Sequence, residues 1–198
     1  MKLNFCGHDD RYAVEQCLLA YFPDERPVYE GEDGARYAWV KLSIGPTYAT
    51  ATTRIVYDGK VGRGISRVLV DHSLSDYDQE GRRQKALRLS FYKAAVAVLG
   101  ASPAWGALTG VRPGKLAARL LVSGLTPKQT DRVLEKTYFV SPERRRLVIE
   151  SAQAGLEAKA DLRPNDISLY VGIPFCPTRC AYCSFVSASV EKSLALID

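Results

Sequence analysis

The chain has 198 residues, of which 46% are hydrophobic and 25% are charged, a composition that is ordinary for a soluble globular protein of one or two domains. Its net charge of +5 agrees with an anionic substrate that bears several carboxylates, and equally with weak affinity for nucleic acid. Residues 1–10 contain no apolar segment of the signal-peptide type, and no apolar stretch approaches the ~20 residues of a membrane helix. A cytoplasmic protein with reduced thiols is therefore expected.

Residues 1–75 predict a short helix and a small antiparallel sheet. Apolar residues at helical spacing predict a helix over residues 12–21, and this places Cys17 in the core. Strands are expected over residues 37–44, 48–57 and 65–70. Asp58-Gly59 is a strong signal for a two-residue hairpin turn.

Residues 76–160 predict a helical region. The longest expected helix covers residues 79–99, and its polar face carries five basic side chains, Arg82, Arg83, Lys85, Arg88 and Lys93. This basic face is either a solvated surface or a surface for an anionic partner. Three further helices are expected, one over residues 115–122, one starting with the capping box of Thr126 and Gln129, and one starting at Ser141-Pro142. Residues 161–166 are polar and contain a proline, as expected for a linker to a last region over residues 167–198.

Three of the five cysteines, Cys176, Cys180 and Cys183, lie within eight residues in the pattern C-x3-C-x2-C. Cysteine thiolates at short fixed spacings are the usual ligands of iron–sulfur clusters. Three thiolates can hold three irons of a four-iron, four-sulfur cluster. The fourth iron receives no ligand from this loop, and an open iron is a place where a small molecule can bind and receive an electron.

Other interpretations of the cysteine loop remain open. A structural zinc ion needs four ligands, and the remaining candidates, Cys6, Cys17, His8 and His72, form no second short-spaced pair. A redox pair of Cys180 and Cys183 leaves Cys176 without a role. Three buried cysteines acting as small apolar residues are the third alternative.

The apolar run over residues 167–173 precedes the cysteine loop and predicts a strand that is buried on both faces. Pro174 ends this strand, so the loop follows its carboxyl end. In barrels of alternating strands and helices, active sites form at that end. Residues 191–197 are expected to form the first helix after the loop.

The segment from Tyr170 to Cys176, followed by Cys180, Tyr182 and Cys183, resembles the radical S-adenosylmethionine enzymes. Within that superfamily, the Ile-Pro-Phe-Cys lead-in is similar to the oxygen-independent coproporphyrinogen III oxidases. The stretch Leu108 to Pro113, Leu-Thr-Gly-Val-Arg-Pro, resembles the HemZ-type branch, called coproporphyrinogen dehydrogenase.

The resemblance implies a [4Fe-4S] cluster held by the three loop cysteines, with S-adenosyl-L-methionine on the open iron. It places Tyr170 against the nucleoside of that cofactor and Tyr182 beside the bound cofactor. It implies oxidative decarboxylation of coproporphyrinogen III to protoporphyrinogen IX, driven by a 5′-deoxyadenosyl radical and by an electron donor such as flavodoxin or ferredoxin. The cofactor carries that chemistry, while the protein orients and shields it. A nucleic-acid partner is not expected.

The resemblance also implies that the loop opens a TIM-like α/β barrel, which normally needs roughly 200 residues or more. Only 15 residues follow Cys183, so we expect the N-terminal part of a longer enzyme, inactive by itself, with catalytic residues beyond residue 198. The expected fold class is thus an α+β N-terminal domain followed by the first strand, loop and helix of a radical SAM barrel.

Two positions depart from the family pattern. Gly172 stands where the family commonly has histidine, and Phe185 stands where the best-understood porphyrinogen oxidases carry a fourth cysteine. The second departure keeps an alternative open, a haem-binding chaperone of the same family that lacks decarboxylase activity.

Overall fold

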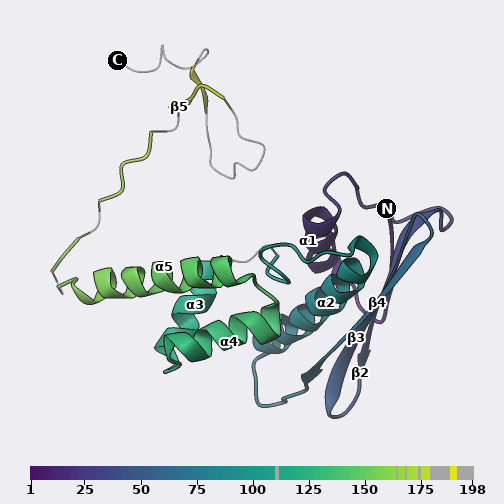
Figure 1. Ribbon diagram of the computed structural model, residues 1–198, viewed down its shortest axis with the longest axis horizontal. Coiled ribbons are helices and arrows are strands. Elements are labelled where there is room, and N and C mark those ends of the chain that lie inside the picture. The colour runs from purple at the N-terminus through teal and green to yellow at the C-terminus, as the bar shows by residue number, and fades with distance from the viewer. Residues whose placement is uncertain (110–111, 164, 168, 174, 179–187, 191–198) are drawn as a thin grey trace. The chain divides into compact units, whose positions relative to one another are not determined.

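The computed structural model describes residues 1–109, 112–163, 165–167, 169–173, 175–178 and 188–190. The chain divides into two compact units, residues 1–160 and residues 161–198 (Figure 1). Unit 1 is an α+β fold with one four-stranded sheet and five helices. Within the described ranges, no helix combines the length and the apolar character that crossing a membrane would require.

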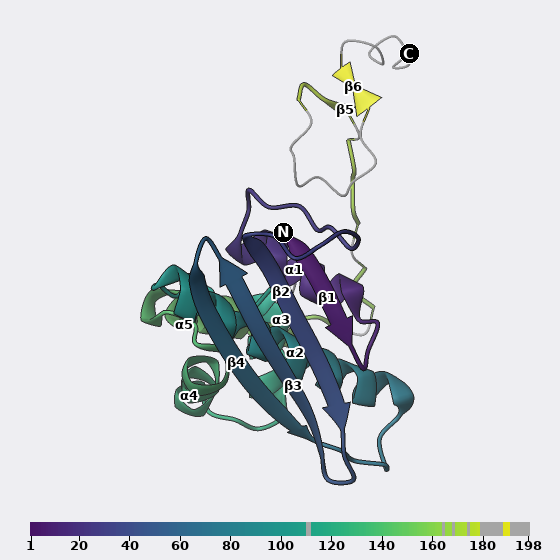
Figure 2. The same ribbon diagram turned by 90° about the vertical axis from the view of Figure 1, so that its right-hand side faces the viewer.

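The sheet of unit 1 has the strand order β1–β2–β3–β4 (Figure 2). Its strands are β1 (Lys2–Cys6), β2 (Arg36–Ile44), β3 (Tyr48–Tyr57) and β4 (Lys60–Leu69). The prediction of a purely antiparallel sheet is wrong, because β1 pairs parallel to β2 while the other pairs are antiparallel. Residues 1–10 gave no strand signal because Leu3 is the one fully buried side chain of β1. The crossover that a parallel pair requires runs through a helix.

That crossover helix, α1 (Arg11–Tyr21), and the long helix α2 (Asp76–Leu99) cover one face of the sheet (Figure 2). The predicted hairpin turn is confirmed, since Asp58 and Gly59 have φ angles of 49° and 82°. The strand after the turn begins at Lys60, five residues earlier than predicted. Gly62 and Gly64 interrupt its pattern of alternating side chains, and at both positions the backbone of α2 lies too close for a Cβ atom.

Three shorter helices complete unit 1, α3 (Pro113–Val122), α4 (Pro127–Tyr138) and α5 (Pro142–Ala160). The capping box predicted at the start of α4 is confirmed, with both of its reciprocal hydrogen bonds between Thr126 and Gln129. These helices enclose a second apolar core that includes Leu116, Leu134, Val140 and Ile149. The ring of Phe139 stacks on Tyr92 of α2 with 5.1 Å between the ring centroids, so the helices and the sheet layer are packed together.

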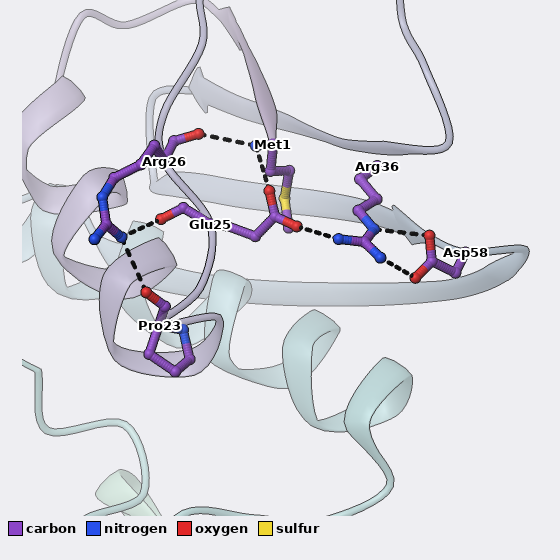
Figure 3. Close-up of polar contacts among 6 residues, drawn as sticks. All are labelled: Met1, Pro23, Glu25, Arg26, Arg36 and Asp58. Carbon is purple, nitrogen blue, oxygen red and sulfur yellow. Dashed lines mark hydrogen bonds and ion pairs between the residues drawn. The ribbon is translucent and has the colours of Figure 1, made fainter.

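A chain of charged groups ties the first strand to the hairpin (Figure 3). The carboxylate of Glu25, only 9% exposed, accepts hydrogen bonds from the amino group of Met1 at 2.6 Å and from Arg36 Nη1 at 2.9 Å. The same guanidinium donates to both oxygens of Asp58 at 2.7 Å. Glu25 therefore connects the ends of β1 and β2, which are neighbours in the sheet.

The described residues of unit 2 contain one short parallel strand pair, β5 (Phe175–Cys176) and β6 (Ala188–Ser189). The strand predicted over residues 167–173 is not shown, because the described residues 167 and 169–173 carry no strand pairing and their apolar side chains are 75–93% exposed. A parallel strand buried on both faces needs hydrogen-bonded neighbours and covering layers, and the described residues supply neither to this stretch. The barrel start is accordingly absent from the described residues, while Pro174 and the helix expected over residues 191–197 lie outside them.

Candidate functional site

In the sequence, the cysteine loop begins at β5 and ends before β6. Cys176 is the second residue of β5, where its thiol is free and half-buried. The parallel pairing sets Cys176 opposite Ser189, so the chain is again beside β5 when it reaches β6. Cys180, Tyr182, Cys183 and Phe185 come between these strands in sequence and lie outside the described residues. The structure thus places one of the three predicted ligands.

Tyr170, the residue predicted to contact the nucleoside, is 84% exposed and lies six residues before Cys176. Its ring covers Gly172, since a Cβ atom added to Gly172 would lie 3.1 Å from Tyr170 Cε1. Gly172 therefore lies in close contact with this tyrosine. Any side chain at position 172 would require this ring to shift by a few tenths of an ångström.

The two cysteines of unit 1 differ from the loop cysteines in surroundings. The prediction that Cys17 is a core residue is confirmed, because its side chain is fully buried and its sulfur lies 3.6 Å from Thr109 Oγ1. Burial raises the pKa of this thiol to about 11, which keeps it protonated and inert. Cys6 is exposed at the end of β1. In the described part of the chain, no group of three or more His, Cys, Asp and Glu side chains gathers to hold a metal ion.

A cavity of about 540 Å³ opens in unit 1 beside α2, where α3 and the end of α4 approach that helix. Four basic side chains line it, Arg82, Lys85, Arg88 and Arg119. Three of them belong to the basic face of α2 that is visible in the sequence. Leu108, Leu116 and Tyr138 supply apolar surface to the same cavity.

The sequence identified three of the four basic residues of this cavity as a basic helix face, but it predicted neither Arg119 nor the cavity. Their spacing on α2 is visible in the sequence, and it is equally typical of a solvated helix face. Arg119 and Tyr138 approach them only through the packing of α3 and α4. A local pattern cannot report that packing.

The chain was compared with family models, curated proteins and solved structures. No family model and no solved structure matches it. It is 30% identical over 192 residues to the oxygen-independent coproporphyrinogen-III oxidase-like protein HemZ of Bacillus subtilis (strain 168). That match covers 93% of this chain and 37% of the relative, so it extends into both units, and the chain spans little more than a third of the relative's length.

Proposed function

We propose that this chain is part of a longer radical S-adenosylmethionine enzyme of the coproporphyrinogen dehydrogenase type. The proposed reaction is the oxygen-independent oxidative decarboxylation of coproporphyrinogen III to protoporphyrinogen IX in haem biosynthesis. The observation that carries the proposal is the C-x3-C-x2-C loop, and the similarity to the HemZ protein over both units supports it.

In this proposal Cys176, Cys180 and Cys183 bind three irons of a [4Fe-4S] cluster. The free, half-buried thiol of Cys176 fits a ligand, because thiolate ligands must be accessible to the metal and not already bonded. With S-adenosyl-L-methionine bound, such a cluster supplies hydrogen-atom abstraction from a substrate propionate, which then loses carbon dioxide and one electron to become a vinyl group. The loop cysteines leave one iron without a protein ligand, as that chemistry requires.

The remaining residues of unit 2 would position the cofactor. Tyr170 offers an exposed ring to the nucleoside, and Tyr182 would lie beside the bound cofactor. The exposed apolar run over residues 167–173 would become the first barrel strand when further strands of the longer protein pair with it. An electron donor such as flavodoxin or ferredoxin would reduce the cluster.

The cluster is tested first, on this 198-residue chain. Anoxic reconstitution with iron and sulfide should give the brown absorbance of a [4Fe-4S] cluster, and the substitution Cys180→Ala should abolish it. Cys6→Ala is the matched control, because Cys6 is exposed in unit 1 and outside the loop. A Cys180→Ala spectrum identical to that of the unchanged chain would remove the ligand assignment.

The reaction is tested on the full-length protein. With dithionite and S-adenosylmethionine it should release 5′-deoxyadenosine, and added coproporphyrinogen III should be converted to protoporphyrinogen IX under anoxic conditions. An absence of 5′-deoxyadenosine from protein that carries its cluster would overturn the radical mechanism.

A haem-binding chaperone is the second candidate, favoured by Phe185 at the position of the fourth cysteine of the well-understood oxidases. This candidate predicts stoichiometric haem binding by the full-length protein without turnover of coproporphyrinogen III. Turnover without haem binding would exclude it.

A further inference from the structure

We propose that the cavity of unit 1 is a binding site for a small polycarboxylate with a flat apolar body. The choice of a carboxylated porphyrin as its ligand rests on the proposed function. The preference for a polycarboxylate follows independently from the residues that line the cavity.

The lining of the cavity contains more basic than acidic side chains. Among the described residues, the ion pairs include none to Lys85, Arg88 or Arg119, and Arg82 has only a long contact of 3.8 Å to Asp71. Since the net charge of the lining is positive, an anion is the ligand that it favours.

Two carboxylates also line the cavity, and both are already hydrogen-bonded to their own helix or its cap. Asp78 accepts a hydrogen bond from the Ser75 hydroxyl at 2.6 Å, at the start of α2. Glu80 accepts one from the Gln84 amide at 2.8 Å. Because these donors are neutral, both carboxylates keep their charge, and the four basic side chains still outnumber the two acidic ones in the lining.

Arg88 provides the most direct evidence that the cavity binds an anion. Its Nε atom is buried, and no acceptor among the described residues lies within hydrogen-bonding distance. Within the described ranges, its guanidinium makes one weak contact, 3.4 Å from Nη2 to Gln84 Oε1. A buried donor of a charged group that lacks an acceptor is costly, and a carboxylate in the cavity would satisfy it.

The apolar part of the lining favours an organic anion over an inorganic one. Leu108 and Leu116 present aliphatic surface, and Tyr138 presents an aromatic ring whose face is 4.8 Å from Lys85 Nζ. A volume of about 540 Å³ lies within the range of small-molecule sites. A phosphate ion would leave most of this surface without contact.

The spacing of the cations favours a ligand with separated carboxylates. Arg82, Lys85 and Arg88 follow one stripe of α2 and span roughly 9 Å along the helix axis at about 1.5 Å per residue. Arg119 faces the cavity from α3. A tetrapyrrole with propionates around its rim places several carboxylates at comparable separations about a flat apolar ring.

Binding is measured on the 198-residue chain by titrating coproporphyrin III, the stable oxidised form, and following its fluorescence and absorbance. Arg88→Gln and Arg119→Gln should each weaken binding by about tenfold or more, the effect of removing one charge-assisted hydrogen bond. Arg83→Gln is the matched control, because Arg83 is on α2 but does not line this cavity. Equal affinity in all three variants would overturn the proposal.

Two further measurements identify the chemical class of the ligand that the cavity binds. The tetramethyl ester of coproporphyrin III lacks the charges and should bind at least about tenfold more weakly than the free acid. A single-stranded oligonucleotide should not displace the porphyrin. If it does, and if Arg88→Gln abolishes this displacement, the cavity would be assigned to nucleic acid instead. Cluster reconstitution is independent of these measurements, so failure here leaves the cysteine assignment standing, and the reverse also holds.

Discussion

The two units of this chain obtain their structure in different ways. Unit 1 buries two apolar cores, one under the sheet and one among α3, α4 and α5. Unit 2 has a short strand pair, and the apolar side chains that precede it are largely exposed. The difference indicates that unit 1 is stabilised by its own packing, whereas the described residues of unit 2 do not bury one another.

The largest expected effect on the packing of unit 1 is at the contact between β4 and α2. A Cβ atom at Gly64 would overlap the carbonyl oxygen of Ser90 and lie 2.8 Å from the backbone nitrogen of Ala94. Because both obstacles are helix backbone, Gly64→Ala must push α2 off the sheet. We expect it to lower the free energy of unfolding by about 3 kcal/mol, measured by urea denaturation followed by far-UV circular dichroism.

Gly155→Ala is the control for this substitution. Gly155 lies within α5 and no atom surrounds the position of its Cβ, so alanine should stabilise the helix by up to about 1 kcal/mol. Iron binding by the cysteine loop should not change in either variant. A loss of cluster in Gly64→Ala would show that the loop depends on unit 1, and would break the contrast between the units.

A smaller effect is expected at the charged network of Figure 3. The amino group of Met1 first, and Arg36 second, hold the pKa of Glu25 below its ordinary value of 4.5, against the opposing effect of burial. A carboxyl whose pKa is lowered by folding stabilises the protein above its unfolded pKa, and this contribution is lost as pH falls through the folded pKa. Glu25→Gln should cost about 2 kcal/mol at about pH 7, because it leaves the buried amino group of Met1 and the half-exposed guanidinium of Arg36 with a weaker acceptor.

The pH dependence separates this explanation from a simple packing defect. The difference in unfolding free energy between the unchanged chain and Glu25→Gln should shrink as pH falls from about 5 toward about 3, since protonated glutamic acid and glutamine are both neutral. A C-terminal purification tag keeps the amino group of Met1 free. A difference that stays constant with pH would contradict the assigned role of the Glu25 charge.

Local sequence signals predicted the parts of the fold that are decided locally. The hairpin at Asp58-Gly59 and the capping box of Thr126 are set by the residues that form them, and both are confirmed. The strand β1 was missed because its place is decided by pairing with β2, a strand distant in sequence, and not by a local pattern. The run over residues 167–173 carries the local signal of a buried strand, but burial depends on neighbours that the described residues do not provide.

The two candidate sites also differ in whether local sequence signals can predict them. Cysteine spacing is a property of the sequence alone, so Cys176, Cys180 and Cys183 are recognisable from it. Their role as ligands remains a prediction because two of them lie outside the described residues. The cavity, in contrast, is a property of packing. Its basic residues on α2 are visible in the sequence, but Arg119 reaches them from another helix, so the site emerges only in the folded unit.

The smallest expected effect tests the contrast between the units most directly. Val171 is 75% exposed, so Val171→Ser should change the free energy of unfolding of this chain by less than about 0.5 kcal/mol. Val140, 2% exposed in the second core of unit 1, is the matched site, and Val140→Ser should cost about 2 kcal/mol or more. In the full-length protein, where residues 167–173 are proposed to form a barrel strand, Val171→Ser should become as costly as Val140→Ser. A negligible effect there too would mean that this run stays exposed in the longer protein, and the proposed barrel strand would have to be abandoned.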